Sequence, residues 1–266
     1  MGQSSQSQQQ VQRDVERAER TPRPVVAVGH DYPPSFELAR HRHRRSQLIY
    51  AAAGVVTVAT DAGAWVAPPE RAVWIPAGVA HAVKMVGAVS TRSVLVAPEA
   101  CRARGDRCQV LVVSSLLRAL LLAATEVPRR YDRDGRDGLV MALLVAEILQ
   151  APIVPLAVPF PRSAALARRC HAFLARPDAK VGIDEFRAQL GASRRAFTRR
   201  FRRETGVSFA SWRTQACLVA ALPRLAAGER VTSVAVDLGY DSPAAFATMF
   251  KRLLGIPPSQ YRPSSG

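Results

Sequence analysis

The C-terminal part of the chain contains the same sequence pattern twice. The segment SRRAFTRRFRRETGVSFASW begins at Ser193, and the segment SPAAFATMFKRLLGIPPSQY begins at Ser242. Both have phenylalanine at the fifth and ninth positions, a basic pair directly after, and then a glycine followed by an aliphatic residue. Each is preceded by an apolar helical pattern that ends in Leu-Gly, at Gly191 and at Gly239. The repeat therefore predicts two equivalent folded units in this part of the chain.

Each unit is predicted to be a helix-turn-helix, because a helix, a glycine-containing turn and a second helix opened by a serine N-cap form that motif. In the first unit Phe197 and Phe201 lie four residues apart and face inward. The opposite face carries hydrogen-bond donors, namely Arg195, Thr198, Arg199 and Arg202. Arginine fits guanine O6 and N7 in the major groove, and neighbouring cations neutralise phosphates. An ordinary solvated basic face is the alternative, and the duplication disfavours it.

Residues 166 to 262 resemble the DNA-binding domain of the AraC/XylS family, whose signature ends in a unit like DLGYDSPAAFATMFKRLLGIPPSQYR. The resemblance implies two three-helix subdomains joined by a long helix, here about Phe209 to Ala227, with two recognition helices in successive major grooves. The base-reading candidates that it implies are Arg195, Thr198, Arg199, Ala244, Ala245 and Thr248. The other expected DNA-binding residues are Arg194, Arg202, Arg203, Ser242, Lys251 and Arg252.

The second unit departs from this pattern in its donors. Ala244 and Ala245 offer only methyl groups, so this helix either contacts thymine methyls or mainly holds the DNA backbone. Pro223 lies inside the connecting helix and is expected to bend or interrupt it, which would change the spacing of the two units. Cys217 lies in the same helix, where a small buried apolar role is favoured over a redox role.

The composition agrees with a DNA-binding protein and argues against zinc-ribbon, disulfide-rich, secreted and membrane proteins. Lys and Arg number 37 against 21 Asp and Glu, a formal net charge of +16 that favours a polyanionic partner. The four cysteines form no CxxC pair, which argues against a zinc ribbon and against a disulfide framework. The N-terminus has no apolar signal region, and no apolar stretch is long enough to cross a membrane. We expect a cytoplasmic protein with no membrane contact.

The rest of the chain predicts a β-rich domain. Residues 1 to 24 are rich in Gln, Ser, Arg and Glu, so we expect a disordered tail there. Between Leu48 and Val96, short runs rich in Val, Ala and Ile alternate with Gly, Pro and Asp turn signals. Such strands at regular spacing predict a small β-sandwich or β-barrel.

Two helices and a linker are expected to follow. Apolar residues at helical spacing predict helices over 114 to 124 and 136 to 150, which pack either on the barrel or on a second subunit. Four prolines between 151 and 162 exclude a helix or a central strand and predict an interdomain linker. The predicted domains are a sensor and dimerisation domain over 25 to 150 and a DNA-binding domain over 163 to 266.

Three histidines form the candidate ligand site. His41 and His43 point to one face of a predicted strand, and His81 follows a turn. The runs HRHRRSQ and PAGVAH resemble the two half-motifs of the cupin barrel, which implies a divalent metal held by histidines and a glutamate. Gln47 occupies the glutamate position and leaves only a carbonyl oxygen, so a metal would bind more weakly. Three interpretations stay open, namely a metal site, an organic effector site without metal, and solvated basic residues.

From about Tyr32 to Arg262 the chain resembles AraC-type regulators with a cupin sensor. The predicted fold is α+β, with a cupin-like β-barrel and two additional helices before an all-α domain of two helix-turn-helix subdomains. The predicted function is sequence-specific transcriptional regulation controlled by a small-molecule effector. Trp65 and Trp74 are candidates for lining the effector pocket, although core packing is favoured for each.

The expected partners are double-stranded DNA, the effector, RNA polymerase and a second copy of the chain, and no cofactor is required. One alternative is a metal-dependent cupin enzyme with an accessory DNA-binding module, which the lack of an acid/base pair beyond the histidines disfavours. A constitutive nucleoid-type binder is another, and the patterned donor face argues against it.

Overall fold

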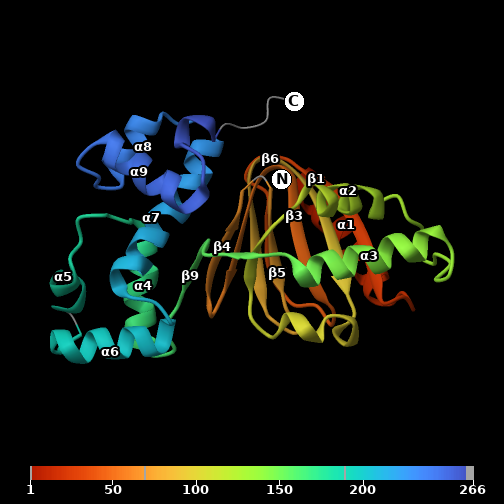
Figure 1. Ribbon diagram of the computed structural model, residues 1–266, viewed down its shortest axis with the longest axis horizontal. Helices are drawn as coiled ribbons and strands as arrows, with labels where there is room; N and C mark the ends of the chain where they lie inside the picture. The colour runs from red at the N-terminus through yellow and green to blue at the C-terminus, as the bar shows by residue number, and fades with distance from the viewer. Residues whose placement is uncertain (1, 69, 189, 262–266) are drawn as a thin grey trace. The chain divides into compact units, whose positions relative to one another are not determined.

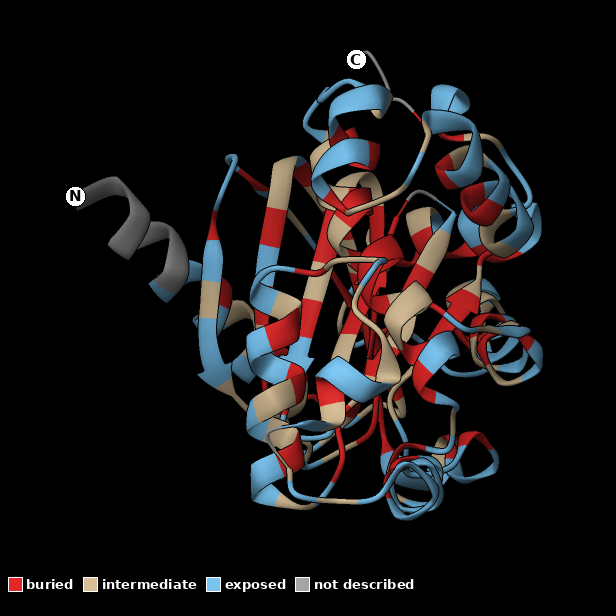
Figure 2. Cartoon of the chain, turned by 90° about the vertical axis from the view of Figure 1, so that its left-hand side faces the viewer, coloured by how far each residue is buried: buried red, intermediate tan, exposed pale blue. Residues whose placement is uncertain are grey.

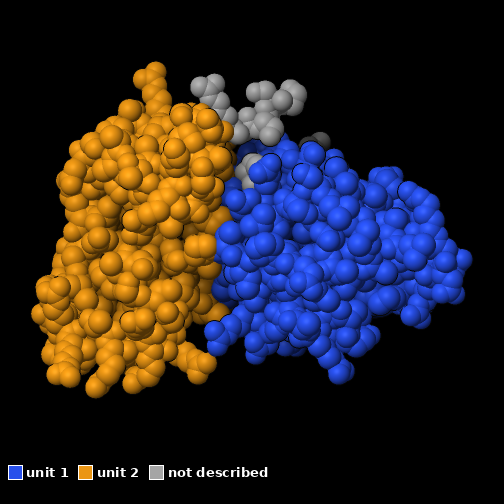
Figure 3. Space-filling view, viewed as in Figure 1, with its two compact units in different colours: residues 1–60, 65–154 blue, residues 61–64, 155–266 orange. Residues whose placement is uncertain are grey.

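The computed structural model describes residues 2–68, 70–188 and 190–261, with side chains described from residue 9 onward. The chain forms two compact units (Figure 3), one of residues 1–60 and 65–154 and the other of residues 61–64 and 155–266. The boundary at 154 falls inside the predicted linker. Within the described residues no helix has the length and apolar character needed to cross a membrane.

The first unit is built on an antiparallel sheet (Figure 1). The strands of this sheet include β1 (Val25–Tyr32), β2 (Glu37–His41), β3 (Ser46–Thr60), β4 (Gly63–Ala67), β5 (Arg71–Ile75), β6 (His81–Val96), β7 (Gln109–Val112) and β8 (Ile153–Val154), and the first two residues of β4 are grouped with the second unit. The order is β1-β6-β3-β5-β7-β8, with β2 paired to β6 and β4 to β3. This confirms the predicted β-rich domain.

One turn signal in the sequence lies inside a strand. Register shifts flank Ala53 in the β3–β6 pairing, next to Gly54, which has φ 74°. A Cβ at Gly54 would lie 2.6 Å from the Ala88 carbonyl oxygen, so only glycine fits this close approach. The runs expected as separate strands on either side of Gly54 are therefore one irregular strand.

Alternation along the strands divides the sheet into two faces. On β3, Leu48 and Tyr50 join a core that also contains buried residues of the two following helices, whereas Gln47 and Ile49 line a cavity. Buried residues concentrate on the strands in Figure 2. One face of the sheet therefore packs a core, and the other is available for a ligand.

The two helices after the sheet lie where the sequence predicts them. They are α2 (Ser115–Ala124) and α3 (Arg136–Gln150), and short 3₁₀ turns at η1 (Pro98–Ala100) and η2 (Arg102–Arg104) precede them. The Ser114 side chain accepts a hydrogen bond from the Leu117 backbone N–H, as an N-cap does. Leu117, Leu121 and Leu144 are fully buried against the sheet core.

The expectation of a disordered tail over 1 to 24 is wrong, because Gly2–Glu19 forms helix α1. Val11, Val15 and Ala18 recur at helical spacing on one face, and Ala18 and Val15 pack with Val26 and other residues of the sheet. The average composition of the segment conceals this stripe. Amphipathic helices draw their stability mainly from tertiary packing, which composition does not describe.

The second unit is helical apart from one short strand, β9 (Ala157–Pro159). Its helices are α4 (Ala164–Ala175), α5 (Ile183–Ala188), α6 (Arg194–Thr205), α7 (Phe209–Ala226), α8 (Val231–Asp237) and α9 (Pro243–Leu254), followed by η3 (Pro258–Gln260). The Trp212 indole N–H donates to the Pro159 carbonyl oxygen at 2.8 Å and fixes the entering chain to α7. The predicted linker thus contains the ordered strands β8 and β9.

Candidate DNA-binding face and sensor cavity

Helices α6 and α9 have the same local construction. Ser193 and Ser242 cap them by accepting hydrogen bonds from the backbone N–H groups of Ala196 and Ala245. Each ends at a glycine with positive φ, 79° at Gly206 and 82° at Gly255, whose N–H donates to a carbonyl of the last turn. The repeat in the sequence is therefore a repeat in structure.

An aromatic core fixes the position of α6. Phe186 on α5 is fully buried, and its ring centroid lies 4.6 Å from that of Phe209 and 6.0 Å from that of Phe197. Phe201 and Trp212 also contact it. In the second helix-turn-helix unit, Phe246 and Phe250 occupy the positions that correspond to Phe197 and Phe201. Both are fully buried, and their ring centroids are 5.7 Å apart. Both phenylalanine pairs face inward, as their spacing predicts.

Ion pairs divide the six arginines of α6 into two groups. Arg194 lies 3.3 Å from the carboxylate of Asp184, and Arg200 lies 2.9 Å from that of Glu204. The remaining arginines of α6 are exposed and line one shallow surface together with Thr198, namely Arg195, Arg199, Arg202 and Arg203. Arg194 also borders this surface, but its ion pair ties it to α5.

The outward face of α9 is different in kind. Ala244, Ala245 and Thr248 are exposed on it, and Ser242 is half-buried at its start. The Thr248 hydroxyl donates to the Ala244 carbonyl oxygen at 2.9 Å. Its methyl group and the lone pairs of its hydroxyl oxygen remain for other contacts. The first half of the helix therefore offers methyl groups. The cations Lys251 and Arg252 lie exposed in its last turn.

Helix α7 connects the two helix-turn-helix units without a break. It spans Phe209–Ala226 and contains Pro223 in its last turn, so the expected interruption does not occur. Proline removes one backbone donor, but this close to a helix end few hydrogen bonds depend on it. Arg224 then contacts Glu229 at 2.7 Å and Asp237 at 2.5 Å, and these ion pairs raise the pKa of its guanidinium.

Cys217 is fully buried in the middle of α7. Burial raises the pKa of its thiol to about 12, so the group is a neutral thiol at pH 7. This agrees with the packing role favoured from the sequence.

A cavity of about 350 Å³ lies between the sheet and α1. Its apolar wall is formed by Val28, Ile49, Val83 and Met85, together with Val11 and Val15 of α1. The size is that of a pocket for a small organic molecule. The contribution of α1 was missed from the sequence, although the helical spacing of Val11, Val15 and Ala18 was a signal for it.

Polar atoms at one end of this cavity have no partner among the described residues. Gln47 is buried at 6% exposure, and its Oε1 accepts no hydrogen bond from them. Nε2 of His43, which also lines the cavity, is likewise buried without a partner there, as is Nε2 of His81, whose ring centroid lies 5.3 Å from that of His43. Buried polar atoms of this kind are rare and point to a group that binds there.

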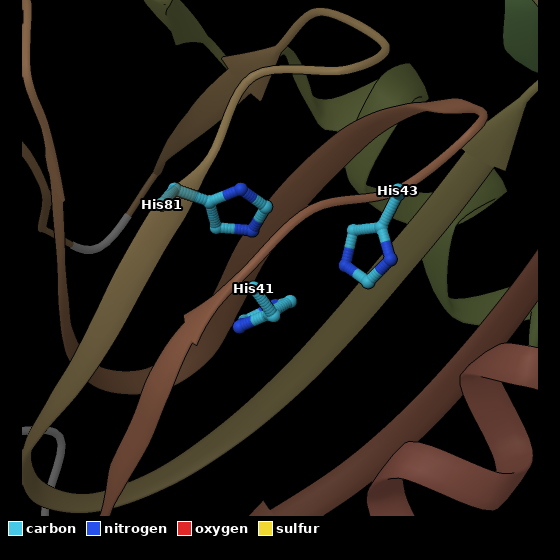
Figure 4. Close-up of side chains that lie close together, drawn as sticks. All are labelled: His41, His43 and His81. Atoms are coloured by element: carbon cyan, nitrogen blue, oxygen red, sulfur yellow. The ribbon is translucent and has the colours of Figure 1, made fainter.

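The three candidate histidines meet at this end (Figure 4), with one potential ligand atom from each lying within 4.8 Å of the others. The ring centroids of His41 and His81 are 4.4 Å apart, and those of His41 and His43 are 4.8 Å apart. His41 ends β2, His81 begins β6, and His43 lies in the turn after β2 rather than in a strand.

Backbone hydrogen bonds fix two of these rings. The Nδ1 of His41 donates to the Ala39 carbonyl oxygen at 2.6 Å, and the Nδ1 of His81 donates to that of Val79 at 2.9 Å. A carbonyl oxygen only accepts, so Nδ1 carries a proton in both rings. Burial, assisted by the charge of His41, lowers the pKa of His43 to about 4. Burial also lowers the pKa of His81 to about 4, so both imidazoles are neutral at pH 7.

The two tryptophans considered for the pocket lie elsewhere. Trp74 is fully buried in the core that contains α2 and α3, on the opposite side of its strand from the cavity. Trp65 is 5% exposed and does not line the cavity either. Both are therefore buried outside the cavity, which agrees with the core packing favoured from the sequence.

The chain has two helix-turn-helix units, one of them with an exposed arginine-rich helix, and a β-sheet domain with a cavity. This combination defines a DNA-binding transcriptional regulator with a sensor domain. Residues 23–144 match the family described as "AraC-like ligand binding domain", and residues 187–264 match the family described as "Helix-turn-helix domain". The HTH-type transcriptional regulator NimR of Escherichia coli (strain K12) is 32% identical over 221 residues, covering 83% of this chain and 81% of NimR. The chain belongs to the AraC family of helix-turn-helix transcriptional regulators.

Solved structures resemble the chain more weakly. ToxT from Vibrio cholerae O395 is 10% identical and has a TM-score of 0.37, with 90% of this chain and 96% of ToxT covered. The C-terminal domain of AraT from Geobacillus stearothermophilus is 24% identical with a TM-score of 0.35, covering 37% of this chain and 84% of that domain.

Proposed function

We propose that the two helix-turn-helix units recognise DNA by different chemistry. Among the described residues, Arg195 and Arg199 are exposed on the outer face of α6 without ion pairs like those that hold Arg194 and Arg200. Their guanidinium groups suit guanine edges in the major groove, while Arg202 and Arg203 in the last turn suit phosphates. This separation of free from paired arginines is the observation that carries the proposal.

Helix α9 is proposed to contact thymine. The exposed Ala244, Ala245 and Thr248 present methyl groups near its N-terminus. The thymine 5-methyl is the apolar group of the major groove, and alanine and threonine methyls are its usual partners. Lys251 and Arg252 would hold the phosphates beside it. The operator would then have one half-site defined by guanine and one defined by thymine.

The sensor cavity is proposed to bind a small-molecule effector. The cavity combines an apolar wall with Gln47 Oε1 and His43 Nε2, which have no partner among the described residues, and the likewise unpartnered Nε2 of His81 lies next to His43. These polar atoms are all acceptors, so an organic effector would present donor groups to them. For such binding to control transcription, the effector must have different affinities for the DNA-competent and DNA-incompetent states.

The same end of the cavity also fits a divalent first-row metal ion. Three imidazoles are a donor set that such ions prefer, and Gln47 adds a carbonyl oxygen. The Nε2 atoms of His43 and His81 have no partner among the described residues. We propose that His41, His43 and His81 hold the ion through Nε2. The metal would supply positive charge at this end, and the apolar part of the cavity would remain for an organic group.

A second copy of this chain is the proposed protein partner. Leu116 on α2 and Leu139 and Leu143 on α3 are exposed at 49%, 67% and 45%. An exposed apolar stripe on a helix is buried most simply against the same stripe of a second copy about a two-fold axis.

We also propose that the protein contacts RNA polymerase and that it acts in the cytoplasm, where the DNA is. For the cavity we propose a binding role rather than a catalytic one.

The test is binding of the purified protein to DNA by fluorescence anisotropy. The DNA from upstream of its own gene is compared with a shuffled duplex at two salt concentrations. Specific recognition predicts a preference of about 1000-fold or more that persists when salt is raised. Equal binding to both duplexes, abolished by salt, would leave only charge attraction and would refute the proposal. With the preferred duplex, the assay becomes a screen for effectors.

A further inference from the structure

The three histidines differ in how their second ring nitrogen is held. His41 and His81 each donate from Nδ1 to a backbone carbonyl close by in sequence. The Nδ1 of His43 instead lies 3.6 Å from Oε1 of Glu19, the last residue of α1. At 3.6 Å this contact is longer than a hydrogen bond, and it places a negatively charged oxygen, which can only accept, beside Nδ1. It favours a proton on Nδ1 and leaves the lone pair on Nε2.

The Glu19 carboxylate is held in place by the backbone. Its Oε1 accepts a hydrogen bond of 2.6 Å from the N–H of Arg44, the residue after His43. The Arg45 guanidinium binds carbonyl oxygens on the segment that follows α1, with distances of 2.6 Å to Thr21 and 2.7 Å to Arg23. The end of α1 and the turn that carries His43 are therefore fastened together.

The body of α1 has a second attachment. Asp14 lies 3.4 Å from His30 on β1 and 3.2 Å from Arg129, which follows α2. With Val15 and Ala18 packed on the sheet, α1 has apolar and charged contacts to the same domain. The placement of Glu19 is thus a property of the docked helix.

We infer that Glu19 is a positioning residue for the metal ion, because it orients the His43 ring from α1 so that Nε2 faces His41 and His81. This inference rests on the proposed metal site. In metal sites a carboxylate that accepts from the second nitrogen of a histidine fixes the ring and increases its basicity. Metal binding and docking of α1 would then strengthen each other, since linkage is reciprocal.

The test uses the full chain with Zn²⁺ or Co²⁺ as the only ligand. Glu19→Gln keeps the acceptor for the Arg44 N–H and removes the charge, so the fold is expected to persist. Glu16→Gln removes the same charge one turn earlier on α1, from an exposed residue that borders the cavity but whose carboxylate accepts from Gln12. Calorimetry gives the affinity, the visible spectrum of bound Co²⁺ reports its coordination, and hydrogen exchange reports the docking of α1.

The expected result is a loss of metal affinity of about 10- to 100-fold in Glu19→Gln, as for other outer carboxylates, with a changed Co²⁺ spectrum. Glu16→Gln should stay within about twofold of wild type, which separates orientation of His43 from a general effect of charge. Metal should slow hydrogen exchange of α1 in the wild type and much less in Glu19→Gln.

Two outcomes overturn different claims. If Glu19→Gln binds metal as the wild type does while His43→Ala binds none, the role of Glu19 is refuted and the metal site stands. If the wild type binds neither ion, the metal site itself is refuted. Equal losses in Glu19→Gln and Glu16→Gln would also refute orientation, because they would show only a charge effect.

Discussion

The Asp178 carboxylate occupies the space beside Gly239, where an added Cβ would overlap Asp178 Oδ1. Asp178 belongs to the loop between α4 and α5 in the first subdomain, and Gly239 forms the turn of the second helix-turn-helix. The Ala179 N–H donates to the Leu238 carbonyl oxygen at 2.8 Å, and Arg213 of α7 donates to the Val181 carbonyl oxygen at 2.6 Å. The separation of the two recognition helices therefore depends on this loop as well as on α7.

Gly239→Ala is predicted to destabilise the DNA-binding unit and disturb the placement of α9. Gly239 has φ 74°, and Gly191 at the corresponding turn has φ 60° but no described atom within 4 Å of its added Cβ. Gly191→Ala should cost about 1–2 kcal/mol from backbone strain alone. Gly239→Ala should cost about 1–3 kcal/mol more because Asp178 must move. Chemical denaturation of both variants measures the difference, and equal losses would contradict the close contact.

Arginine substitutions on α6 should separate base recognition from phosphate binding. Arg195→Ala and Arg199→Ala are each expected to cost about 1–3 kcal/mol in specific binding and to relax base preference. Arg203→Ala should weaken binding to all sequences alike and reduce the salt dependence. Anisotropy with a set of single-base operator variants measures both effects. Equal losses of DNA affinity in all three variants, without a change in base preference, would refute the assignment of Arg195 and Arg199 to base recognition.

Replacing thymine by uracil tests the assignment of α9, because it deletes only the 5-methyl group. On an operator selected from random duplexes, each contacted thymine is expected to lose about 0.8 kcal/mol, roughly fourfold in affinity. Substitution in the half-site bound by α6 serves as the matched control and should have little effect. In the Ala244→Gly/Ala245→Gly variant the uracil effect should shrink. Full affinity for the uracil operator would show that α9 holds only the DNA backbone.

The sequence predicted the elements whose signals are local. The serine caps at 193 and 242, the phenylalanine pairs and the glycine stops lie within single helices, so the repeat specifies two helix-turn-helix units. The alternating strands and the two helices after them were also predictable, because their periodicities are strong. The meeting of His41, His43 and His81 follows from the pairing of β2 with β6, in which His41 lies opposite His81.

Other features depend on partners that are distant in sequence. Helix α1 was missed because Val15 and Ala18 are few among polar residues and are stabilised by Val26 and Leu95 of the sheet. The division of the arginines depends on Asp184 and Glu204, and only Glu204 lies on α6 itself. Trp74 was ambiguous because strand alternation does not tell which face of a sheet bears the cavity.

Pro223→Ala tests how far the connecting helix sets the spacing of the two DNA-binding units. Alanine restores a backbone donor toward the Val219 carbonyl oxygen and removes the crowding of the proline ring, so the DNA-binding unit should become more stable by about 1–3 kcal/mol. The preferred spacing of the half-sites should not change, because α7 is already continuous and the contacts of Arg224 and Asp178 hold the second helix-turn-helix unit in place. Thermal unfolding and anisotropy on operators with one base pair added or removed measure the two effects. A shift of the preferred spacing in Pro223→Ala would instead show that the proline sets the geometry of the second unit.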